Sequence, residues 1–129
     1  MVKRNQMTTR LSGEQFIAAN DEHEIPMKGG HPSPVDYLVA SLGGCAGLTL
    51  KAILEKKRIR VDELEVSTDA KWDENNRYLE TIDLTFKVRA EGLTEQKLQS
   101  SIALSHKHCP VHQTFEQNVN INTDGEILT

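Results

Sequence analysis

Cysteine is scarce in this chain, which has only Cys45 and Cys109. Two thiols so far apart are too few to hold a small secreted fold together by disulfides. The N-terminal residues 1–6 lack the apolar core of a signal peptide. No apolar run is expected to approach the ~20 residues needed to span a bilayer. Together these absences predict a cytoplasmic protein without a membrane partner.

A strong charge of either sign is also missing. The net charge is −4, so the basic surface typical of a nucleic-acid-binding protein is not expected. Hydrophobic residues make up 37% of the chain and charged residues 26%, which is an ordinary globular balance that argues against disorder. Without repeats, linkers or low-complexity stretches, the 129 residues predict a single domain over 1–129.

The pattern along the chain predicts an α+β fold. Short alternating runs over 2–26 indicate two or three strands. The breaker cluster at 29–34 ends in Ser33 and Pro34, which are typical of a helix start. Residues 35–57 form the least polar segment and are apolar on nearly every side, so a helix in the middle of the structure is expected there.

Two strands should follow this central helix as an antiparallel pair. Alternation over 64–72 and 82–90 places the apolar side chains on one face, which we expect to pack on the central helix. The remaining predicted elements are a helix over 94–107, a short helix from Pro110, and a strand over 119–121. An Asp-Gly turn at 124–125 is expected after this strand. The expected architecture is antiparallel sheets around a central helix that carries Cys45.

Three glycines surround Cys45 in the predicted helix: Gly43, Gly44 and Gly47. Each costs a helix interior roughly 0.8–1 kcal/mol relative to alanine, so the sequence must gain something from them. Either another backbone packs closely there or a ligand reaches the sulfur. The helix that starts at Pro110 is the expected neighbour. The simpler alternative is a core thiol that packs as a small hydrophobe.

Cys109 has a different setting, directly before Pro110. As the N-cap of a short helix, its sulfur would face free backbone N–H groups, and this arrangement lowers a thiol pKa. His106, His108 and His112 could add positive charge when protonated. Local electrostatics therefore nominate Cys109 as the more acidic of the two thiols.

The same histidines leave a zinc site as an alternative. His108, Cys109 and His112 are all metal-binding residue types, but a fourth ligand would have to come from elsewhere. Neither a CxxC pair nor an HExxH motif is present. Histidines on a solvated helix end are the simpler interpretation.

Two motifs give a resemblance to a known family. The segment PVDYLVASLGGC over 34–45 and the Cys109-Pro110-Val111 motif resemble the two cysteine motifs of the OsmC/Ohr family, the osmotically inducible and organic hydroperoxide resistance proteins. The order of elements matches this family from about residue 10 to the C-terminus. The resemblance is to the OsmC-like branch rather than to the hydroperoxide-resistance branch proper.

The resemblance implies a function and an assembly. By the family pattern, Cys45 attacks an organic hydroperoxide and becomes a sulfenic acid. Cys109 then condenses with it to a disulfide, which a dithiol reductant resets. This is the reversible part of thiol oxidation. The resemblance also implies an intertwined homodimer with sites at the subunit interface, and it implies no cofactor and no metal.

Two features of the family pattern are matched only in part here. The family's best peroxidases have a carboxylate ten positions before the first cysteine, where this chain has Val35, while Asp36 stands nine before. In a regular helix Asp36 would lie opposite Cys45, so a role in capping the first turn is expected. The family also has an N-terminal arginine, for which Arg4 and Arg10 are the candidates.

A non-enzymatic alternative remains open besides zinc. The chain could be an OsmC-like dimer that binds a small molecule in an apolar groove, with two incidental thiols. Loss of free thiol on adding cumene hydroperoxide separates the peroxidase from this alternative, while bound metal and destabilisation by chelators would indicate zinc.

Overall fold

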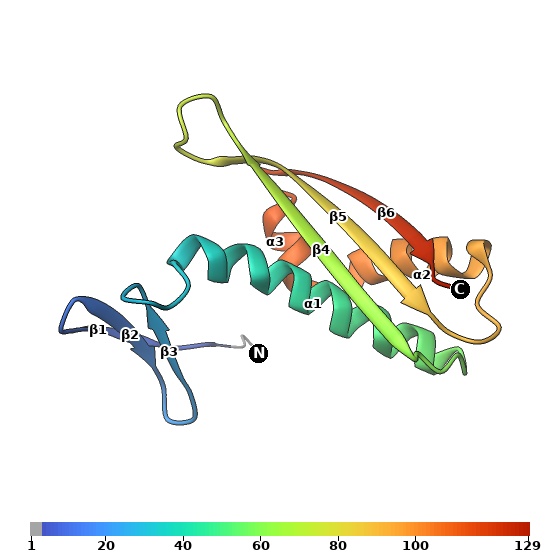
Figure 1. The fold of residues 1–129 in the computed structure, drawn as a ribbon, viewed down its shortest axis with the longest axis horizontal. Coiled ribbons are helices and arrows are strands. Elements are labelled where there is room, and N and C mark those ends of the chain that lie inside the picture. The colour runs from blue at the N-terminus through green and yellow to red at the C-terminus, as the bar shows by residue number, and fades with distance from the viewer. Residues whose placement is uncertain (1–3) are drawn as a thin grey trace. The chain divides into compact units, whose positions relative to one another are not determined.

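A computed structural model describes residues 4–129 (Figure 1). The chain divides into two compact units, the first ending at Leu38 and the second beginning at Val39. The elements in chain order are β1 (Thr8–Ser12), β2 (Gln15–Ala19), β3 (Glu24–Met27), α1 (Pro34–Lys56), β4 (Glu63–Trp72), β5 (Leu79–Arg89), α2 (Glu95–His108), α3 (Pro110–Phe115) and β6 (Asn120–Ile127). The predicted α+β fold with a long helix carrying Cys45 is confirmed, while the single domain over 1–129 stays a prediction.

The first unit is an antiparallel sheet in the order β1-β2-β3. Gly13 lies in the β1–β2 turn with a φ of 65°, a left-handed conformation that glycine adopts without steric cost. The unit also contains the start of α1. There the Ser33 hydroxyl accepts the Asp36 N–H at 3.2 Å and the Asp36 carboxylate accepts the Ser33 N–H at 3.0 Å. This reciprocal capping arrangement confirms Ser33 as the helix cap.

The second unit contains a sheet in the order β4-β5-β6. Strands β4 and β5 pair antiparallel, with Val66 opposite Phe86, as the alternating pattern predicts. Strand β6, however, pairs parallel to β5, so the expectation of purely antiparallel sheets is wrong for this strand. The connection from β5 to β6 carries two helices, and such a crossover returns the chain to the end of the sheet from which β5 starts.

Strand β6 also runs further than the sequence indicates. An end at residue 121 was expected because Asp124-Gly125 is typical of a turn, but the strand continues through both residues to Ile127. A Cβ on Gly125 would lie 2.6 Å from Ile102 Cδ1 and 3.2 Å from Leu98 Cδ2. The glycine therefore allows α2 to pack closely on the strand, and it makes no turn.

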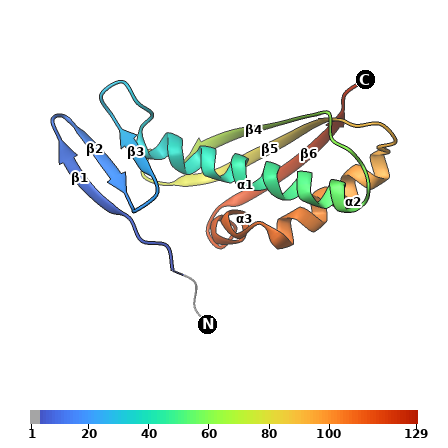
Figure 2. The same ribbon diagram turned by 90° about the horizontal axis from the view of Figure 1, so that it is seen from below.

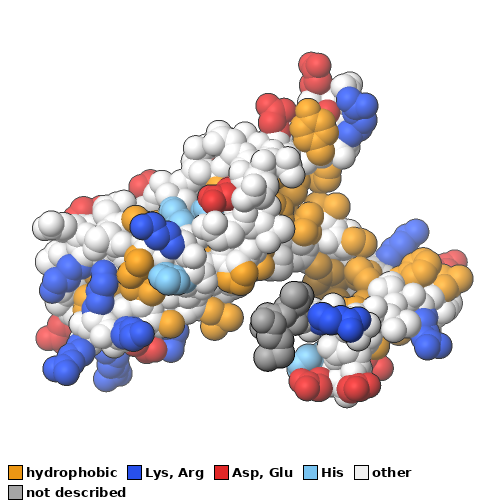
Figure 3. Space-filling view, turned by 180° about the vertical axis from the view of Figure 1, so that it is seen from behind, with side chains coloured by type: hydrophobic (Ala, Val, Ile, Leu, Met, Phe, Trp, Pro, Cys, Tyr) orange, Lys and Arg blue, Asp and Glu red, His pale blue; other side chains and the backbone are white. Residues whose placement is uncertain are grey.

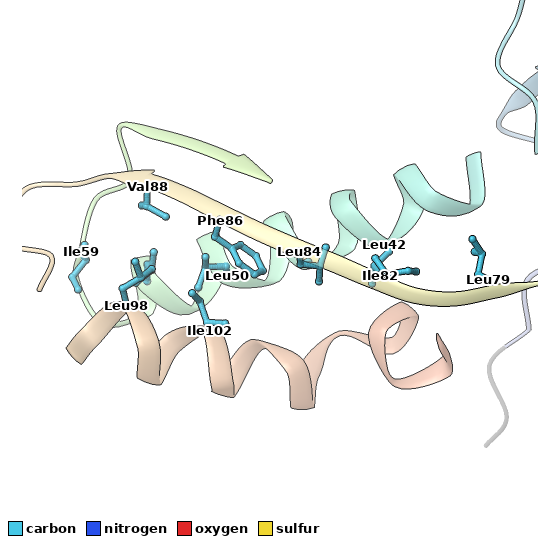
Figure 4. Packing of buried hydrophobic residues seen from close by; sticks show 12 residues of the cluster. Leu42, Leu50, Ile59, Leu79, Ile82, Leu84, Phe86, Val88, Leu98 and Ile102 are labelled. Carbon is cyan, nitrogen blue, oxygen red and sulfur yellow. The ribbon is translucent and has the colours of Figure 1, made fainter. Parts of the chain in front are cut away.

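The hydrophobic core of the second unit lies between its sheet and two helices. Helices α1 and α2 cover the same face of the sheet (Figure 2). The inward side chains of β5 pack between them (Figure 4). They are Ile82, Leu84, Phe86 and Val88, each at most 1% exposed. Alternation along β5 leaves the polar face outside, as expected for a half-buried sheet.

Helix α1 buries one stripe of side chains rather than its whole circumference. Leu42, Ala46, Leu50 and Leu54 recur every fourth residue and are buried, whereas Leu48 is 74% exposed and Leu38 is 46% exposed. By length and composition α1 could cross a membrane, with a mean hydropathy of 1.5 in its most apolar window. The expectation that no segment is long and apolar enough is therefore wrong, although core helices share these properties and this stripe packs in the chain's own core.

Helices α2 and α3 lie where the sequence predicts them. Thr94 caps α2 and accepts the Lys97 N–H at 3.2 Å. Leu98, Ile102 and Ser105 of α2 are buried, which confirms its predicted inward face. The short helix predicted from Pro110 is α3.

Candidate active site

Cys45 lies near the middle of α1, beside the buried stripe. Its side chain is neither fully buried nor exposed, because its neighbours Leu42 and Ala46 face the core while Gly44 faces open space. The Thr49 hydroxyl donates to the Cys45 carbonyl oxygen at 2.7 Å. The thiol thus stands at the edge of the core, on a well-ordered helical turn.

Cys109 lies at the junction of α2 and α3. It ends the first helix and caps the second, with Pro110 at the first helical position, as predicted. Its sulfur accepts the backbone N–H of His112 at 3.4 Å. The residue is only 1% exposed, so the cap is buried where the sequence suggested a solvated helix end.

The fold of the second unit brings the two thiols together. The Cys109 thiol lies close enough to Cys45 for the two side chains to interact, and both cysteines are free thiols. Burial, and then the interaction with Cys45, raise the pKa of Cys109 to about 11, against the smaller opposing effect of the His112 N–H. The prediction that the capping position makes Cys109 an acidic thiol is therefore wrong, because burial outweighs the cap.

The glycines around Cys45 serve a different neighbour from the one expected. A Cβ on Gly43 would lie 2.7 Å from Thr68 Oγ1, and one on Gly47 would lie 3.3 Å from Val66 Cγ2. Both contacts are on β4, so strand β4 makes the close approach to this strip of α1 that was assigned to the Pro110 helix. Gly44 has no such neighbour within 4 Å.

A groove runs between α1 and the start of β4, and Cys45 is not among the residues that line it. Its volume is about 490 Å³. The α1 wall is formed by the three glycines together with Leu48 and Lys51, and the other wall by residues 61–64 and Val66. Its lining is mainly apolar, with charged side chains toward one end.

Two histidines form a stack beside the Cys109 cap. The rings of His106 and His112 lie with centroids 4.4 Å apart and planes 13° apart, and His112 Nε2 is 3.3 Å from Glu116 Oε2. Burial, and then the neighbouring His112, lower the pKa of His106 below its usual 6.5. His106 and His112 were expected near Cys109, but their stack and the contact with Glu116 were not predicted, although residues one helical turn apart such as His112 and Glu116 commonly interact.

The candidate zinc ligands do not come together. His108 is exposed, Cys109 is buried against Cys45, and the His112 ring is engaged with His106 and Glu116. Across residues 4–129, no group of three or more His, Cys, Asp or Glu side chains is placed to hold a metal ion.

The other candidate residues belong to the first unit. Asp36 accepts the Ser33 N–H, which confirms its expected capping role. Arg10 is exposed on β1 and Arg4 is exposed before that strand. Neither arginine has a described interaction with a cysteine, so their assistance to Cys45 stays a prediction.

A family model described as "OsmC-like protein" matches residues 27–124. The chain belongs to this OsmC-like family. A sequence relative is Protein YhfA of Escherichia coli K12, 31% identical over 112 residues, which covers 82% of this chain and 84% of YhfA. Its name states no activity.

Solved structures share the fold. An OsmC-like protein from Mycoplasma pneumoniae superposes with a TM-score of 0.88 at 20% identity, with all of both chains covered. The organic hydroperoxide resistance protein OhrB of Bacillus subtilis gives a TM-score of 0.65 at 18% identity, covering 94% of this chain and 96% of that one. At such identities the likeness concerns the fold.

Proposed function

We propose that this protein is a thiol peroxidase that reduces organic hydroperoxides, with Cys45 as the attacking thiol and Cys109 as the resolving thiol. The proximity of the two thiols in the fold, close enough for their side chains to interact, carries the proposal. A disulfide forms without backbone movement only where the Cα atoms of the two cysteines already lie near each other. The hydroperoxide-resistance proteins among the structures of the same fold support this substrate class.

The reaction balances in two steps. The Cys45 thiolate attacks the peroxide oxygen, the O–O bond breaks, and the alkoxide takes a proton and leaves as an alcohol. The Cys45 sulfenic acid then condenses with the Cys109 thiol to give a disulfide and water. A dithiol reductant restores both thiols by exchange and is itself oxidised to a disulfide.

The division of roles follows from burial. Cys109 holds its proton at neutral pH because its pKa is raised to about 11, and a protonated thiol is a poor nucleophile toward peroxide. Cys45 is the less buried of the two, so a substrate can reach it more easily. We therefore assign the attack to Cys45.

The same proposal includes an intertwined homodimer in the cytoplasm. The exposed apolar side of α1, with Leu48 74% exposed, supports burial against a second copy. Two free thiols suit a reducing compartment.

The first prediction tests the roles of the two cysteines. With Cys109→Ser, one equivalent of cumene hydroperoxide should still be consumed per chain, leaving a sulfenic acid on Cys45 that over-oxidises readily. With Cys45→Ser, consumption should fall to background and Cys109 should stay reduced. Free-thiol titration and mass spectrometry of the labelled peptides measure both outcomes.

Two results would contradict these assignments. A sulfenic acid on Cys109 in the Cys45→Ser protein would exchange the roles. If neither variant differed from the wild type in peroxide consumption, the proposed peroxidase function would be excluded. Hydrogen peroxide is the comparison substrate, and it should react more slowly because it has no apolar part to bury.

The α1–β4 groove favours a second candidate function, the binding of a small apolar molecule. The groove has the size and mainly apolar lining of a ligand site, and Cys45 does not line it. If this were the whole function, cumene hydroperoxide would cause no loss of free thiol beyond that of a denatured control.

A further inference from the structure

Three titratable side chains beside the Cys109 cap have no part in the chemistry described so far. They are His106, His112 and Glu116, joined by the ring stack and by the contact of Glu116 with His112 Nε2. Within residues 4–129, His106 Nε2 and His112 Nδ1 are buried and have no hydrogen-bond partner. Such nitrogens are rare in native proteins, and a catalytic role is one of the few explanations.

The contact with Glu116 defines the protonation of the neutral His112 ring. The 3.3 Å contact of Nε2 with the Glu116 carboxylate favours the tautomer with its hydrogen on Nε2, which leaves Nδ1 with a free lone pair. A carboxylate on the far nitrogen orients the ring and stabilises its protonated form, as in catalytic carboxylate–histidine pairs. Nδ1 of His112 is therefore placed to act as a base.

The position of His112 in α3 directs this base toward Cys109. Helical side chains lean toward the N-terminus of their helix, and the N-cap of α3 is Cys109, whose sulfur accepts the His112 backbone N–H. Nδ1 is the ring nitrogen nearer to the main chain. The free lone pair thus lies on the main-chain side of the ring, three residues along α3 from the Cys109 cap.

The resolving step needs such a base. Only a thiolate attacks the sulfur of a sulfenic acid, while the buried Cys109 thiol, with a pKa of about 11, carries its proton at neutral pH.

We propose, on the basis of the function proposed above, that His112 is the catalytic base of the resolving step and that Glu116 and His106 are positioning residues for its ring. The Cys109 proton moves to His112 Nδ1, and the Cys109 thiolate attacks the Cys45 sulfur. The S–S bond forms as the S–O bond breaks. The departing hydroxide takes the proton from His112 and leaves as water, so that the imidazole is neutral again.

The surrounding titratable groups fit this proton transfer. They are His106 from α2, Glu116 from α3 and the thiols of Cys45 and Cys109. Burial, and then the neighbouring His112, lower the pKa of His106, against a smaller opposing effect of Glu116. His106 therefore stays neutral and supports the ring without competing for the proton.

The test compares His112→Gln with the wild type in stopped-flow experiments with cumene hydroperoxide. Glutamine keeps an N–H donor for Glu116 and removes the ring nitrogen that has the free lone pair. The ratio of the rate of disulfide formation to the rate of first thiol loss should fall about 10- to 100-fold at pH 7, within or just below the usual contribution of a general base. Over-oxidised Cys45 should accumulate in excess peroxide.

The pH profile separates a base from a structural support. The wild-type rate of disulfide formation should level off once the imidazole is neutral. In His112→Gln the rate should keep rising about tenfold per pH unit toward the thiol's own pKa. His108→Gln, an exposed histidine of the same segment, is the matched control and should resemble the wild type.

Glu116→Gln provides a second variant at a partly exposed side chain, 42% accessible, so the test does not depend on folding of the buried substitution. The rate of disulfide formation should fall about three- to tenfold in this variant. Disulfide formation as fast as in the wild type in both His112→Gln and Glu116→Gln would overturn the proposal. A rate in His112→Gln that follows the wild-type pH profile would also overturn it.

A second oxidant distinguishes this proposal from the peroxidase function. Diamide, an azo compound, adds to the Cys45 thiolate, and the Cys109 thiolate then displaces the reduced hydrazine, which takes the proton. If cumene hydroperoxide leaves the wild-type thiols intact, the peroxidase function fails. The diamide rates of the wild type, His112→Gln and His108→Gln still decide whether His112 deprotonates Cys109, because slowing in His112→Gln alone supports it and equal rates refute it.

Discussion

Cys109 combines two opposing influences at the level of a single residue. The capping position gives its sulfur a backbone N–H donor from His112, which favours the thiolate. Burial in the core and the interaction with Cys45 favour the thiol, and they prevail, raising its pKa to about 11. A low-dielectric environment acts on the whole charge, whereas one long N–H···S contact stabilises it only slightly.

The raised pKa predicts that stability falls at alkaline pH. The unfolded thiol loses its proton near pH 9, while the folded thiol keeps it to about pH 11. Between these values the folded state binds more protons, so its free energy of unfolding decreases as pH rises. We expect a loss of about 1–2 kcal/mol between pH 8 and pH 11.

Urea unfolding under reducing conditions at several pH values measures this loss. Other groups also titrate in this range, so the relevant quantity is the difference between the wild type and Cys109→Ala. An equal pH dependence of the two proteins would show that the Cys109 thiol is not protected as the structure indicates.

Close approach of backbones recurs at the level of secondary-structure elements. Strand β4 packs against Gly43 and Gly47 of α1, and α2 packs against Gly125 of β6. In each case the glycine removes the Cβ that would hold the two elements apart. These three glycines set the spacing of the layers in the second unit.

Gly125→Ala should therefore destabilise the protein. The new Cβ would lie 2.6 Å from Ile102 Cδ1 and 3.2 Å from Leu98 Cδ2, so α2 would have to shift or its side chains would have to leave their preferred rotamers. We expect a loss of about 1–3 kcal/mol in the free energy of unfolding, typical of overpacking.

The neighbouring exposed residue supplies the control for this change. Glu126→Ala on the same strand should alter the free energy of unfolding by no more than about 0.5 kcal/mol. Both variants are compared by urea unfolding at one protein concentration. A Gly125→Ala protein as stable as Glu126→Ala would mean that α2 and β6 are less closely packed than described.

At the level of the whole molecule, hydrophobic side chains remain at the surface (Figure 3). Among the large hydrophobic side chains of residues 4–129, Leu48 on α1 is the most exposed, at 74%, and it lines the α1–β4 groove. Its neighbours in the groove are glycines, which leave the helix backbone open to close contact. An apolar helix face of this kind supports the proposed homodimer.

Leu48→Glu should dissociate that dimer. The side chain takes no part in the core of its own chain, so the fold should survive, while a carboxylate in an apolar interface would be costly. We expect the dissociation constant to rise at least ~100-fold, about 2.7 kcal/mol. Ala103→Glu, at an exposed position of α2, is the control and should leave the dissociation constant unchanged. Sedimentation velocity at micromolar concentration measures both variants. A folded wild-type monomer under these conditions would exclude the dimer.

The sequence by itself determined most of the elements. The two-residue period of β4 and β5, the Ser33 and Thr94 caps, and Pro110 at the start of α3 all reflect local sterics and hydrogen bonding, which act over a few residues. The two motifs around Cys45 and Cys109 also sufficed to indicate the family, because they give residue types in a fixed order.

Only the tertiary structure decided the features that depend on distant neighbours. The parallel pairing of β6, its passage through Asp124-Gly125, and β4 as the neighbour of Gly43 and Gly47 arise from packing between layers. The pKa of Cys109 was predicted in the wrong direction for the same reason. Burial and the contact with Cys45 come from the folded core, and no local pattern around Cys109 encodes them.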